Sequence, residues 1–426
     1  MFFYFFYFLC SPILYLFIHC IKFFNKKLYI HLKNEKETIT YAFSQISKID
    51  RIKKKVLLFH AASAGEFEQL KPILKQINRQ KYFVLQTFSS PTIYTKEKNN
   101  LLFDASCYHP YDFFWSSLAF FSKIKPDAYI ITRHDIWPFH LLNANRLNIK
   151  IFYINANFHK NSIWMKWYMR YISKEVFKFL TLCCVPSESI FQNANKIILQ
   201  DKIIITGDSR FEQILNRYEE NIKKEYLPQY FLDSKNIIFG SYDLNDENII
   251  IESLIKCFPD GDKSLVQANQ RIILVPHEID NATILRMSTQ LKKNNFTITK
   301  YSNIHTQEIA TNVLIVDSIG ILADIYKYAQ LSYVGAGFGR GVHSVIEPAA
   351  HGCIISFGPN IELLDEAKYL FKHKLCYMIS NIQDMCKFIT LDIDKNEHRI
   401  MNNTIQEYLI NKKHISQNII NYITQS

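Results

Sequence analysis

Residues 55–88 read KVLLFHAASAGEFEQLKPILKQINRQKYFVLQTF, and this stretch decides the fold. It opens with an apolar run rich in β-forming residues at 56–60, continues with a helical pattern at 66–77, and closes with a second apolar run at 82–88. Short apolar strands that alternate with longer helices are typical of βαβ units, in which the strands are parallel. The stretch therefore predicts the start of a parallel α/β sheet.

The same alternation continues along the chain and later starts again. Further strands are expected at 128–133, 149–156 and 203–207, and a second series at 236–242, 271–278, 313–317, 331–337 and 353–359. The prediction is an α/β protein with two Rossmann-like parallel-sheet domains that face each other across a cleft. The predicted boundaries are a membrane segment at 1–25, a first domain at 36–215, a linker at 216–235, a second domain at 236–395, and a C-terminal helix at 396–426 that can pack back on the first domain.

Composition and charge narrow the classes of partner. Of the 426 residues, 48% are hydrophobic and 21% charged, which is enough for two cores. The formal net charge of +11 favours anionic partners such as nucleic acid, anionic lipid or a phosphorylated substrate. The sequence contains no recognition-helix, RNA-binding or zinc-finger motif, so nucleic acid is not an expected partner. The nine cysteines form no C-x-x-C pair and no metal-ligand spacing, which predicts reduced thiols and no zinc site.

The N-terminal residues 1–24, MFFYFFYFLCSPILYLFIHCIKFF, carry no formal charge before Lys22. About 20 apolar residues suffice to cross the core of a bilayer. The stretch lacks the basic start and the small-residue cleavage site of a signal peptide. Lysines follow it at positions 22, 26, 27, 33 and 36, which predicts that the rest of the chain is cytoplasmic. An interfacial segment broken at Pro12 is the alternative, and both interpretations place the protein on a membrane.

Glu66 is the first candidate for chemistry, because ligands of parallel sheets collect at the carboxyl ends of the strands. It follows the first predicted strand and the small residues 62–65, which allow a tight turn, and it falls at the start of a helix. The helix N-terminus stabilises a carboxylate as an anion, which suits a base. A capping glutamate is the alternative, and the local sequence leaves both interpretations open.

The glycine-rich stretch GAGFGRG at 335–341 resembles a nucleotide-binding loop. Arg340 occupies the place of the third glycine of G-x-G-x-x-G, and the sequence has no G-K-[ST] P-loop, so nicotinamide and ATP-hydrolysing chemistry are not expected. Glu347 then opens a predicted helix, where its carboxylate can accept both hydroxyls of a ribose. Residues 276–278 and 319–321 follow other predicted strands, where backbone N–H groups can bind phosphate.

Aromatic and basic residues alternate between positions 161 and 180. The aromatic members are Trp164, Trp167, Tyr168 and Tyr171, and the basic ones are Lys166, Arg170, Lys174 and Lys178. Their spacing predicts one amphipathic helix. Such a helix suits an anionic membrane surface or a lipid acceptor, and it suits an ordinary half-buried helix equally well.

Six segments, in this order, resemble the bacterial 3-deoxy-D-manno-octulosonic acid (Kdo) transferases of glycosyltransferase family 30. They are HAASAGEFEQLKPIL at 60–74, TRHDIWPF at 132–139, NANFHKNS at 155–162, IIITGDSRFEQI at 203–214, ILVPHEI at 273–279, and VDSIGILADIYKYAQLSYVGAGFGRGVHSVIEPAAHGCIISFGPN at 316–360. The match spans essentially the whole chain. The spellings PHEI and GDSRF look most like the Bacteroidetes-type form of the family.

The resemblance implies a GT-B fold with the acceptor lipid in the N-terminal domain and the donor, CMP-Kdo, in the C-terminal domain. Family members transfer Kdo to lipid IVA, the lipid A precursor of lipopolysaccharide, with inversion at the anomeric carbon and without a metal ion. The resemblance therefore implies CMP-Kdo, lipid IVA and membrane lipids as partners and no cofactor, since CMP-Kdo is a substrate. It also implies a location on the cytoplasmic face of the inner membrane.

Carried over position by position, the resemblance assigns residues to three tasks. Glu66 matches the catalytic base that removes the proton from the acceptor hydroxyl. Asp135 and Arg210 fall where the family stabilises the transition state. The CMP moiety would be held by Pro276, His277, Ile319, Gly320, Ile321, Ser344 and Glu347, the last three near ribose and base.

Four family motifs are altered in this chain. E-T-E-x-W-P reads RHDIWP at 133–138, which leaves Asp135 as the only acid. P-R-H reads PH at 276–277, so a phosphate contact there depends on a histidine that titrates near neutrality. G-N-x-K reads GDSR at 207–210 and keeps a cation, and H-N-x-x-E-P reads HSVIEP at 343–348, which replaces an amide by a hydroxyl.

Two other functions remain open at this point. A GT-B enzyme that uses another donor, such as a UDP-sugar, would bind UDP in preference to CMP. An inactive membrane scaffold is the second alternative, suggested by the altered motifs. The intact Glu66 and Glu347 favour an active enzyme.

Overall fold

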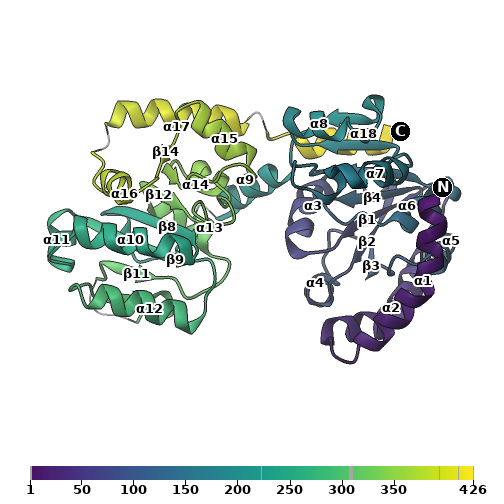
Figure 1. Cartoon of the computed structure of the whole chain (residues 1–426), viewed down its shortest axis with the longest axis horizontal. Helices are drawn as coiled ribbons and strands as arrows, with labels where there is room; N and C mark the ends of the chain where they lie inside the picture. Colours follow the sequence, from purple (N-terminus) through teal and green to yellow (C-terminus); the bar gives the residue numbers. More distant parts are fainter. Residues whose placement is uncertain (1, 222, 307–309, 393, 411, 426) are drawn as a thin grey trace. The chain divides into compact units, whose positions relative to one another are not determined.

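The structure is a computed structural model of the chain, and it describes residues 2–221, 223–306, 310–392, 394–410 and 412–425. The chain divides into two compact units (Figure 1). The first comprises Met1–Gln213 together with Lys412–Ser426, and the second comprises Ile214–Asn411.

The first unit is built on a seven-stranded parallel sheet in the order β3-β2-β1-β4-β5-β6-β7. Its strands are β1 (Lys55–Ala61), β2 (Tyr82–Phe88), β3 (Ala105–Tyr108), β4 (Ala128–Thr132), β5 (Lys150–Ile154), β6 (Leu182–Val185) and β7 (Ile203–Ile205). Its helices are α1 (Phe2–Ile21), α2 (Lys26–Ile46), α3 (Ala64–Gln76), α4 (Pro91–Glu97), α5 (Phe114–Ile124), α6 (Pro138–Arg146), α7 (Arg170–Phe177), α8 (Glu188–Ala194) and α18 (Ile415–Gln425). The central strands are apolar on both faces and buried, as strands covered by helices on both sides must be.

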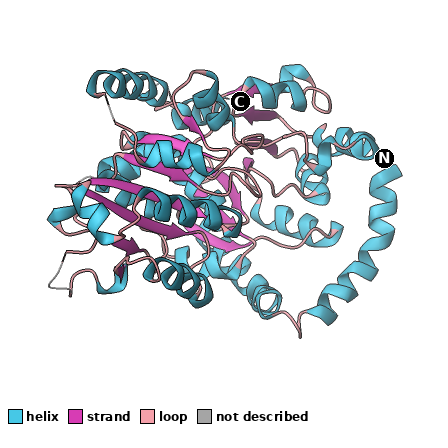
Figure 2. Ribbon diagram, turned by 60° about the vertical axis from the view of Figure 1, so that its left-hand side comes forward, coloured by secondary structure: helices cyan, strands magenta, loops and turns pink. Residues whose placement is uncertain are grey.

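The second unit has its own seven-stranded parallel sheet in the order β10-β11-β9-β8-β12-β13-β14. Its strands are β8 (Lys235–Tyr242), β9 (Gln270–Pro276), β10 (Ile298–Lys300), β11 (Val313–Ile315), β12 (Leu331–Val334), β13 (Ile354–Phe357) and β14 (Tyr377–Met378). Its helices are α10 (Leu244–Cys257), α11 (Asp262–Gln267), α12 (Asn281–Lys292), α13 (Leu322–Ile325), α14 (Ile346–Ala350), α15 (Asp365–Lys372), α16 (Ile382–Ile389) and α17 (Lys395–Ile410). Figure 2 shows helices in front of and behind this sheet.

Both sheets reverse their strand order at one point, and this is where ligands of such sheets bind. In the first unit the reversal lies between β1 and β4, so the loops before α3 and α6 meet there. In the second unit it lies between β8 and β12, so the loops after these two strands meet. The topology therefore places one candidate site at the carboxyl edge of each sheet.

Four strands were not expected from the sequence: β3, β6, β10 and β14. Each has only two to four residues; β3, β10 and β14 are edge strands, and β6 lies beside the edge strand β7. Such short runs show little periodicity, because their pairing partners decide their conformation. The two-domain α/β architecture predicted from the longer strands is confirmed.

The C-terminal segment differs from the single helix expected at 396–426. The described residues form two helices, α17 and α18. Helix α17 contacts α14 in the second unit, whereas α18 belongs to the first unit and packs on α3. Ile419 of α18 is fully buried, and the Ser416 N–H donates to the Glu212 carboxylate at 2.8 Å. The expected linker at 216–235 also begins inside a helix, α9 (Arg210–Asn221).

The aromatic and basic segment at 161–180 is not one continuous helix, contrary to the prediction. Two 3-10 turns, η1 (Ile163–Met165) and η2 (Trp167–Met169), precede α7. Lys166 between the turns has extended backbone angles, φ −67° and ψ 141°, which interrupt a helix. Trp164 consequently packs against Phe177 in the core, while the side chain of Trp167 is 87% exposed.

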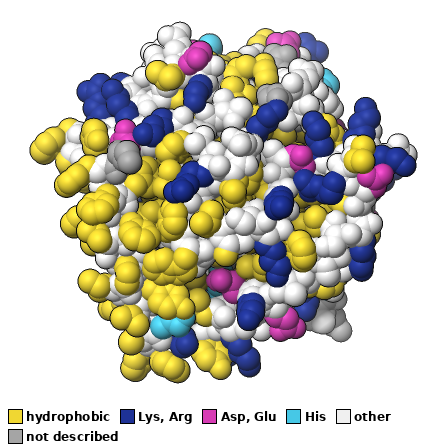
Figure 3. Space-filling model, turned by 90° about the vertical axis from the view of Figure 1, so that its right-hand side faces the viewer, with side chains coloured by type: hydrophobic (Ala, Val, Ile, Leu, Met, Phe, Trp, Pro, Cys, Tyr) yellow, Lys and Arg dark blue, Asp and Glu magenta, His cyan; other side chains and the backbone are white. Residues whose placement is uncertain are grey.

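Helix α1 is the one described helix that is long and apolar enough to cross a membrane. One stripe of it packs on the first unit, because Tyr4 and Ser11 are buried and Tyr7 stacks on Phe139 at 4.5 Å. Its other faces expose large apolar side chains: Phe2, Phe5, Phe6, Leu9, Ile13, Leu16 and Phe17. Figure 3 shows apolar side chains gathered on the face of the molecule that carries this helix, with Lys and Arg among and around them.

Candidate functional site

Glu66 lies at the carboxyl edge of the first sheet, in the first turn of α3. Ser63 caps this helix and forms a capping box with Glu66, in which each side chain binds the backbone N–H of the other residue. The Glu66 Oε2 atom accepts from the backbone N–H of Ala62 at 2.7 Å and of Ser63 at 3.2 Å. The capping interpretation is therefore correct as far as Oε2 is concerned.

The second carboxylate oxygen of Glu66 faces a different group. Its Oε1 atom is 3.7 Å from Nδ1 of His134, whose side chain is half exposed. The capping bonds thus hold the carboxylate in one orientation and leave Oε1 on the side of the loop after β4. A base in this position is preorganised, since its rotamer is set before any substrate arrives.

Asp135 lies next to His134 in the loop after β4 and is held by three donors. The His60 imidazole Nε2 is 2.6 Å from Asp135 Oδ2, and the Ser89 hydroxyl donates to the same oxygen at 3.1 Å. Burial acts to raise the pKa of Asp135, but hydrogen bonds with His60, Trp137 and Ser89 outweigh it and hold this pKa below its ordinary value. Asp135 is therefore a partly buried, ionised carboxylate in the loop that faces Glu66 through His134.

Arg210 opens α9 and is joined to the same loop through Asp208. The Asp208 carboxylate accepts from the Arg210 backbone N–H at 2.8 Å, and its Oδ2 is 3.4 Å from Arg133 Nη1. Arg133 has a left-handed backbone, φ 64°, which is uncommon outside glycine and occurs at functional turns. The Arg133 carbonyl accepts from the Tyr153 hydroxyl, which holds this turn in place.

Asn155, after β5, connects the Arg210 loop to the remaining strands. Its Oδ1 accepts from the Ser209 N–H at 3.0 Å, and its Nδ2 donates to the Ser209 hydroxyl at 2.8 Å. The Ser209 hydroxyl in turn donates to the carbonyl of Gln69 in α3 at 2.7 Å. This buried network links the loops after β5 and β7 to the helix that carries Glu66.

The first unit therefore brings together Glu66, Asp135 and Arg210, the three residues expected to do chemistry. Sequence reasoning missed His60 and Asp208, which partner two of them. His60 was part of the quoted HAASAGE segment, but no local pattern shows that a strand-end histidine pairs with a residue 75 positions later.

In the second unit, His277 lies at the carboxyl end of β9. Its Nδ1 is 3.0 Å from the Ser241 hydroxyl, and its ring stacks on that of His343 with a centroid separation of 4.4 Å. Both histidines line a cavity of about 500 Å³, together with Tyr242, Asp243, Glu247, Arg286 and Arg340. The Arg286 guanidinium is paired with Glu247 through two hydrogen bonds of 2.6 Å. Burial and the neighbouring His277 lower the pKa of His343. Its imidazole is therefore an uncharged part of the cavity lining.

Residues 319–321 form an exposed loop before α13. Ile319 is 90% exposed, and Gly320 has φ +89° with open space where a side chain would stand. The Gly320 carbonyl accepts from Arg217, which also binds the Asp324 carboxylate with two hydrogen bonds. Arg217 thus anchors the loop on its inner side, while the backbone on its outer side faces solvent.

Ser344 and Glu347 lie at the start of α14, where the Ser344 hydroxyl donates to the Glu347 carboxylate. His343, the residue before Ser344, connects this group to the cavity at His277. Pro276 ends β9 and is buried at the same edge. The residues expected to bind the donor substrate therefore all lie in the second unit. Residues 319–321 are held in place by Arg217 and not by the group around His277.

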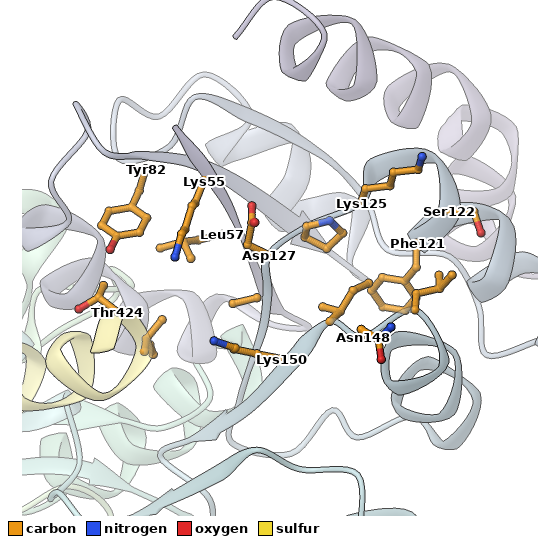
Figure 4. Close-up of a pocket in the computed structure, with 15 residues that line it drawn as sticks. Lys55, Leu57, Tyr82, Phe121, Ser122, Lys125, Asp127, Asn148, Lys150 and Thr424 are labelled. Atoms are coloured by element: carbon orange, nitrogen blue, oxygen red, sulfur yellow. The ribbon is translucent and has the colours of Figure 1, made fainter. Parts of the chain in front are cut away.

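A second cavity of about 500 Å³ lies in the first unit, at the amino ends of β1, β4 and β5 (Figure 4). Lys55, Lys125, Asp127 and Lys150 line it, together with Thr424 of α18. It lies at the opposite edge of the sheet from Glu66, and Asp127 there accepts from the Val56 N–H at 2.7 Å. None of the expected site residues lines it. Among the described residues, no group of three or more His, Cys, Asp or Glu side chains is arranged to hold a metal ion.

Comparison with known proteins finds similarity to one family. Residues 37–213 match the family model described as 3-deoxy-D-manno-octulosonic-acid transferase (kdotransferase). Proteins named 3-deoxy-D-manno-octulosonic acid transferase are similar over most of the chain. The one from Aquifex aeolicus is 25% identical over 79% of this chain and 86% of its own length, and the one from Chlamydia muridarum is 26% identical over 71% and 70%. The chain is similar to this family over most of its length.

These similarities support a glycosyltransferase of the Kdo transferase type. A bifunctional glycosyltransferase/methyltransferase of Fusobacterium nucleatum is 23% identical over 67% of this chain, which spans only 44% of that relative's length. Among solved structures, a UDP-N-acetylglucosamine 2-epimerase homologue from Listeria monocytogenes superposes with a TM-score of 0.61 over 88% of this chain and 98% of its own. At 8% identity this likeness concerns the fold alone, and it agrees with the GT-B class.

Proposed function

We propose that this protein transfers Kdo from CMP-Kdo to lipid IVA, with inversion at the anomeric carbon and without a metal ion. The observation that carries the proposal is the geometry of Glu66. Its Oε2 is engaged by the helix cap, while its Oε1 points toward the loop of Asp135. The match of residues 37–213 to the family model and the position of Glu66 at the reversal point of the first sheet support the same assignment.

In the proposed reaction Glu66 removes the proton of the acceptor's primary hydroxyl as its oxygen attacks the anomeric carbon of Kdo. The bond from that carbon to the phosphate oxygen of CMP breaks, and the phosphate leaves with the bonding electron pair. Arg210 is the proposed cation for the negative charge that develops on this phosphate, and Asp135 is proposed to stabilise the developing positive charge on the sugar. The proposal uses no cofactor, since CMP-Kdo is consumed as a substrate.

The second unit is proposed to bind the CMP moiety. His277 faces a cavity at the carboxyl edge of the sheet, and the outer backbone of Gly320 is open to a ligand. Glu347 at the start of α14 offers a carboxylate suited to the two hydroxyls of a ribose. Pro276, Ile319, Ile321 and Ser344 complete the proposed set.

The test is a transfer assay with the full chain in detergent or vesicles, with CMP-Kdo generated in the reaction, lipid IVA as acceptor and a chelator present. Formation of a Kdo-modified lipid IVA is expected, and CMP, not UDP, should inhibit it. Transfer from a UDP-sugar in place of CMP-Kdo would point to another donor. Absence of CMP and UDP binding together with absence of product would indicate an inactive scaffold.

We further propose that α1 attaches the protein to the cytoplasmic face of the inner membrane as an interfacial helix. The stripe from Tyr4 to Tyr15 contacts the first unit along its length, through Tyr7 on Phe139 and Tyr15 on Phe113. A helix held in this way can insert its exposed apolar faces into the lipid boundary, but it cannot cross the bilayer without leaving the protein.

Alkaline carbonate extraction of membranes that contain the full chain is expected to release the protein, because interfacial helices lack the lipid contacts of a spanning segment. The substitutions Leu9→Asp and Ile13→Asp together place charge on the exposed faces of α1 and should abolish flotation with anionic vesicles. Retention of the native chain in the carbonate pellet would instead show that α1 spans the membrane.

A further inference from the structure

Three histidines of the first unit stack in a buried column behind Asp135. His60 lies near the end of β1, His109 follows β3, and His140 lies in α6. The ring centroids of His60 and His109 are 4.0 Å apart, and those of His109 and His140 are 4.4 Å apart. All three side chains are buried, and the mechanism described above uses none of them.

The hydrogen bonds of His60 define where its protons are. The Thr87 hydroxyl lies 3.0 Å from His60 Nδ1 and donates its single proton to the carbonyl of Phe59 at 3.1 Å. On the other side Nε2 is 2.6 Å from Asp135 Oδ2, and an ionised carboxylate can only accept. The Nε2 atom of His60 therefore carries a hydrogen and donates it to Asp135.

The imidazole of His109, which stacks on His60, is neutral. Burial, together with the neighbouring His60, His140 and His31, holds the pKa of His109 far below its ordinary value. The Tyr129 hydroxyl is 2.9 Å from His109 Nε2.

The far end of the column is fixed on a second carboxylate. His140 Nδ1 is 2.9 Å from Asp112 Oδ1, and Asp112 also accepts from the backbone N–H groups of Phe139 and His140. The Tyr7 hydroxyl of α1 donates to Asp112 at 3.0 Å. The stack is therefore held at both ends, which leaves the His60 ring little freedom to rotate.

We propose that His60 is a positioning residue of the transferase site, which donates from Nε2 to Asp135 and thereby sets where this carboxylate and its loop lie. The inference rests on the proposed function, because that function gives Asp135 its task. His134 precedes Asp135 and is 3.7 Å from Glu66 Oε1, so a displacement of the loop would also change the surroundings of the base. His60 itself touches no substrate in this proposal.

The first test compares His60→Leu, which cannot donate, with His60→Gln, whose amide nitrogen can replace Nε2. His60→Leu is expected to lower kcat about 100-fold, the loss that a displacement of about 1 Å can cause, with the donor KM unchanged. His60→Gln should recover most of this activity. In an Asp135→Asn background, His60→Leu should cause little further loss, because both changes disrupt one unit. His398→Gln, a histidine of α17 bound to the Gly352 carbonyl, is the control for an unrelated substitution.

The second test does not require transferase activity. Infrared spectroscopy can follow protonation of the Asp135 carboxyl, which is identified by its absence in Asp135→Asn. Glu66, His134 and His109 are ionisable groups close to Asp135 or to its partner His60, so the difference from Asp135→Asn is needed at every pH. His60→Leu removes the main donor that lowers the Asp135 pKa, so the protonation midpoint should rise, and the acidic limb of the kcat profile should move to higher pH with it.

The outcomes separate the two proposals. An upward shift of the Asp135 midpoint in a chain without Kdo transfer would retain the role of His60 in holding Asp135 and refute the proposed function. Active transfer with an unchanged midpoint and unchanged kcat in His60→Leu would refute the role of His60 and leave the proposed function intact. Equal losses in His60→Leu and His60→Gln, with the midpoint unmoved, would also refute it.

Discussion

Replacing Glu66 by glutamine is expected to lower kcat for Kdo transfer by about 10²–10⁴-fold, the usual contribution of a general base. Glutamine keeps the length of the side chain and an oxygen that can accept the backbone N–H groups of Ala62 and Ser63. The substitution therefore removes the base while preserving the capping box. The measurement is initial-rate transfer with saturating CMP-Kdo and lipid IVA, with the melting temperature recorded for each protein.

Glu68→Gln is the matched control, because it makes the same chemical change two residues later in the same helix. Glu68 pairs with Lys71 on a partly exposed face and takes no part in the proposed chemistry. Its substitution should leave kcat within about twofold, since surface ion pairs contribute little. An unchanged kcat in Glu66→Gln would assign Glu66 to capping alone and require another base.

Gly337→Val is expected to destabilise the second unit by about 3 kcal/mol or more, because its side chain has no space. A Cβ atom at this position would lie 2.6 Å from the Cα and N atoms of Gly358, and backbone cannot move aside as a flexible side chain can. The loops after β12 and β13 are further joined by the Asn360 N–H, which donates to the Gly337 carbonyl at 2.9 Å. The glycine-rich stretch is thus explained by close packing of these two loops.

Urea unfolding monitored by far-UV circular dichroism measures the loss of stability. Hydrogen exchange of the backbone amides of β12 and β13 shows where in the second unit the loss occurs. Gly65→Ala serves as the control for replacing a glycine, since nothing lies within 4 Å of a Cβ atom there. In the first turn of α3 this change should be neutral or stabilise by up to about 1 kcal/mol. A Gly337→Val protein as stable as the native chain would show that the loops after β12 and β13 can separate without cost.

The candidate site was only partly predictable from the sequence. The strand-end rule and the family resemblance selected Glu66, Asp135 and Arg210, and the structure places them on neighbouring loops of one sheet edge. Local sequence could not decide between capping and catalysis at Glu66, because a helix-start glutamate serves either. In the structure Oε2 of Glu66 serves the cap, while Oε1 faces His134, and the catalytic role of Glu66 stays a prediction.

The aromatic segment at 161–180 shows how local periodicity can mislead. Its aromatic residues recur at helical spacing, but Trp164 turns inward to Phe177 and the chain is extended at Lys166. Packing of one large side chain into the core outweighs the weak preference of a short segment for continuous helix. The C-terminal segment was misjudged for a similar reason, because burial of Ile419 in the first unit separates α18 from α17.

The sequence by itself determined the class of fold, the parallel order of the long strands and the apolar character of α1. These properties depend on periodicities of two and 3.6 residues and on local turn chemistry, which neighbouring residues carry. Only the tertiary structure decided the pairing of His60 with Asp135 and the column that ends at Tyr7 of α1. Such contacts join residues that are far apart in the chain, and their strength comes from burial and geometry that exist only after the sheet has formed.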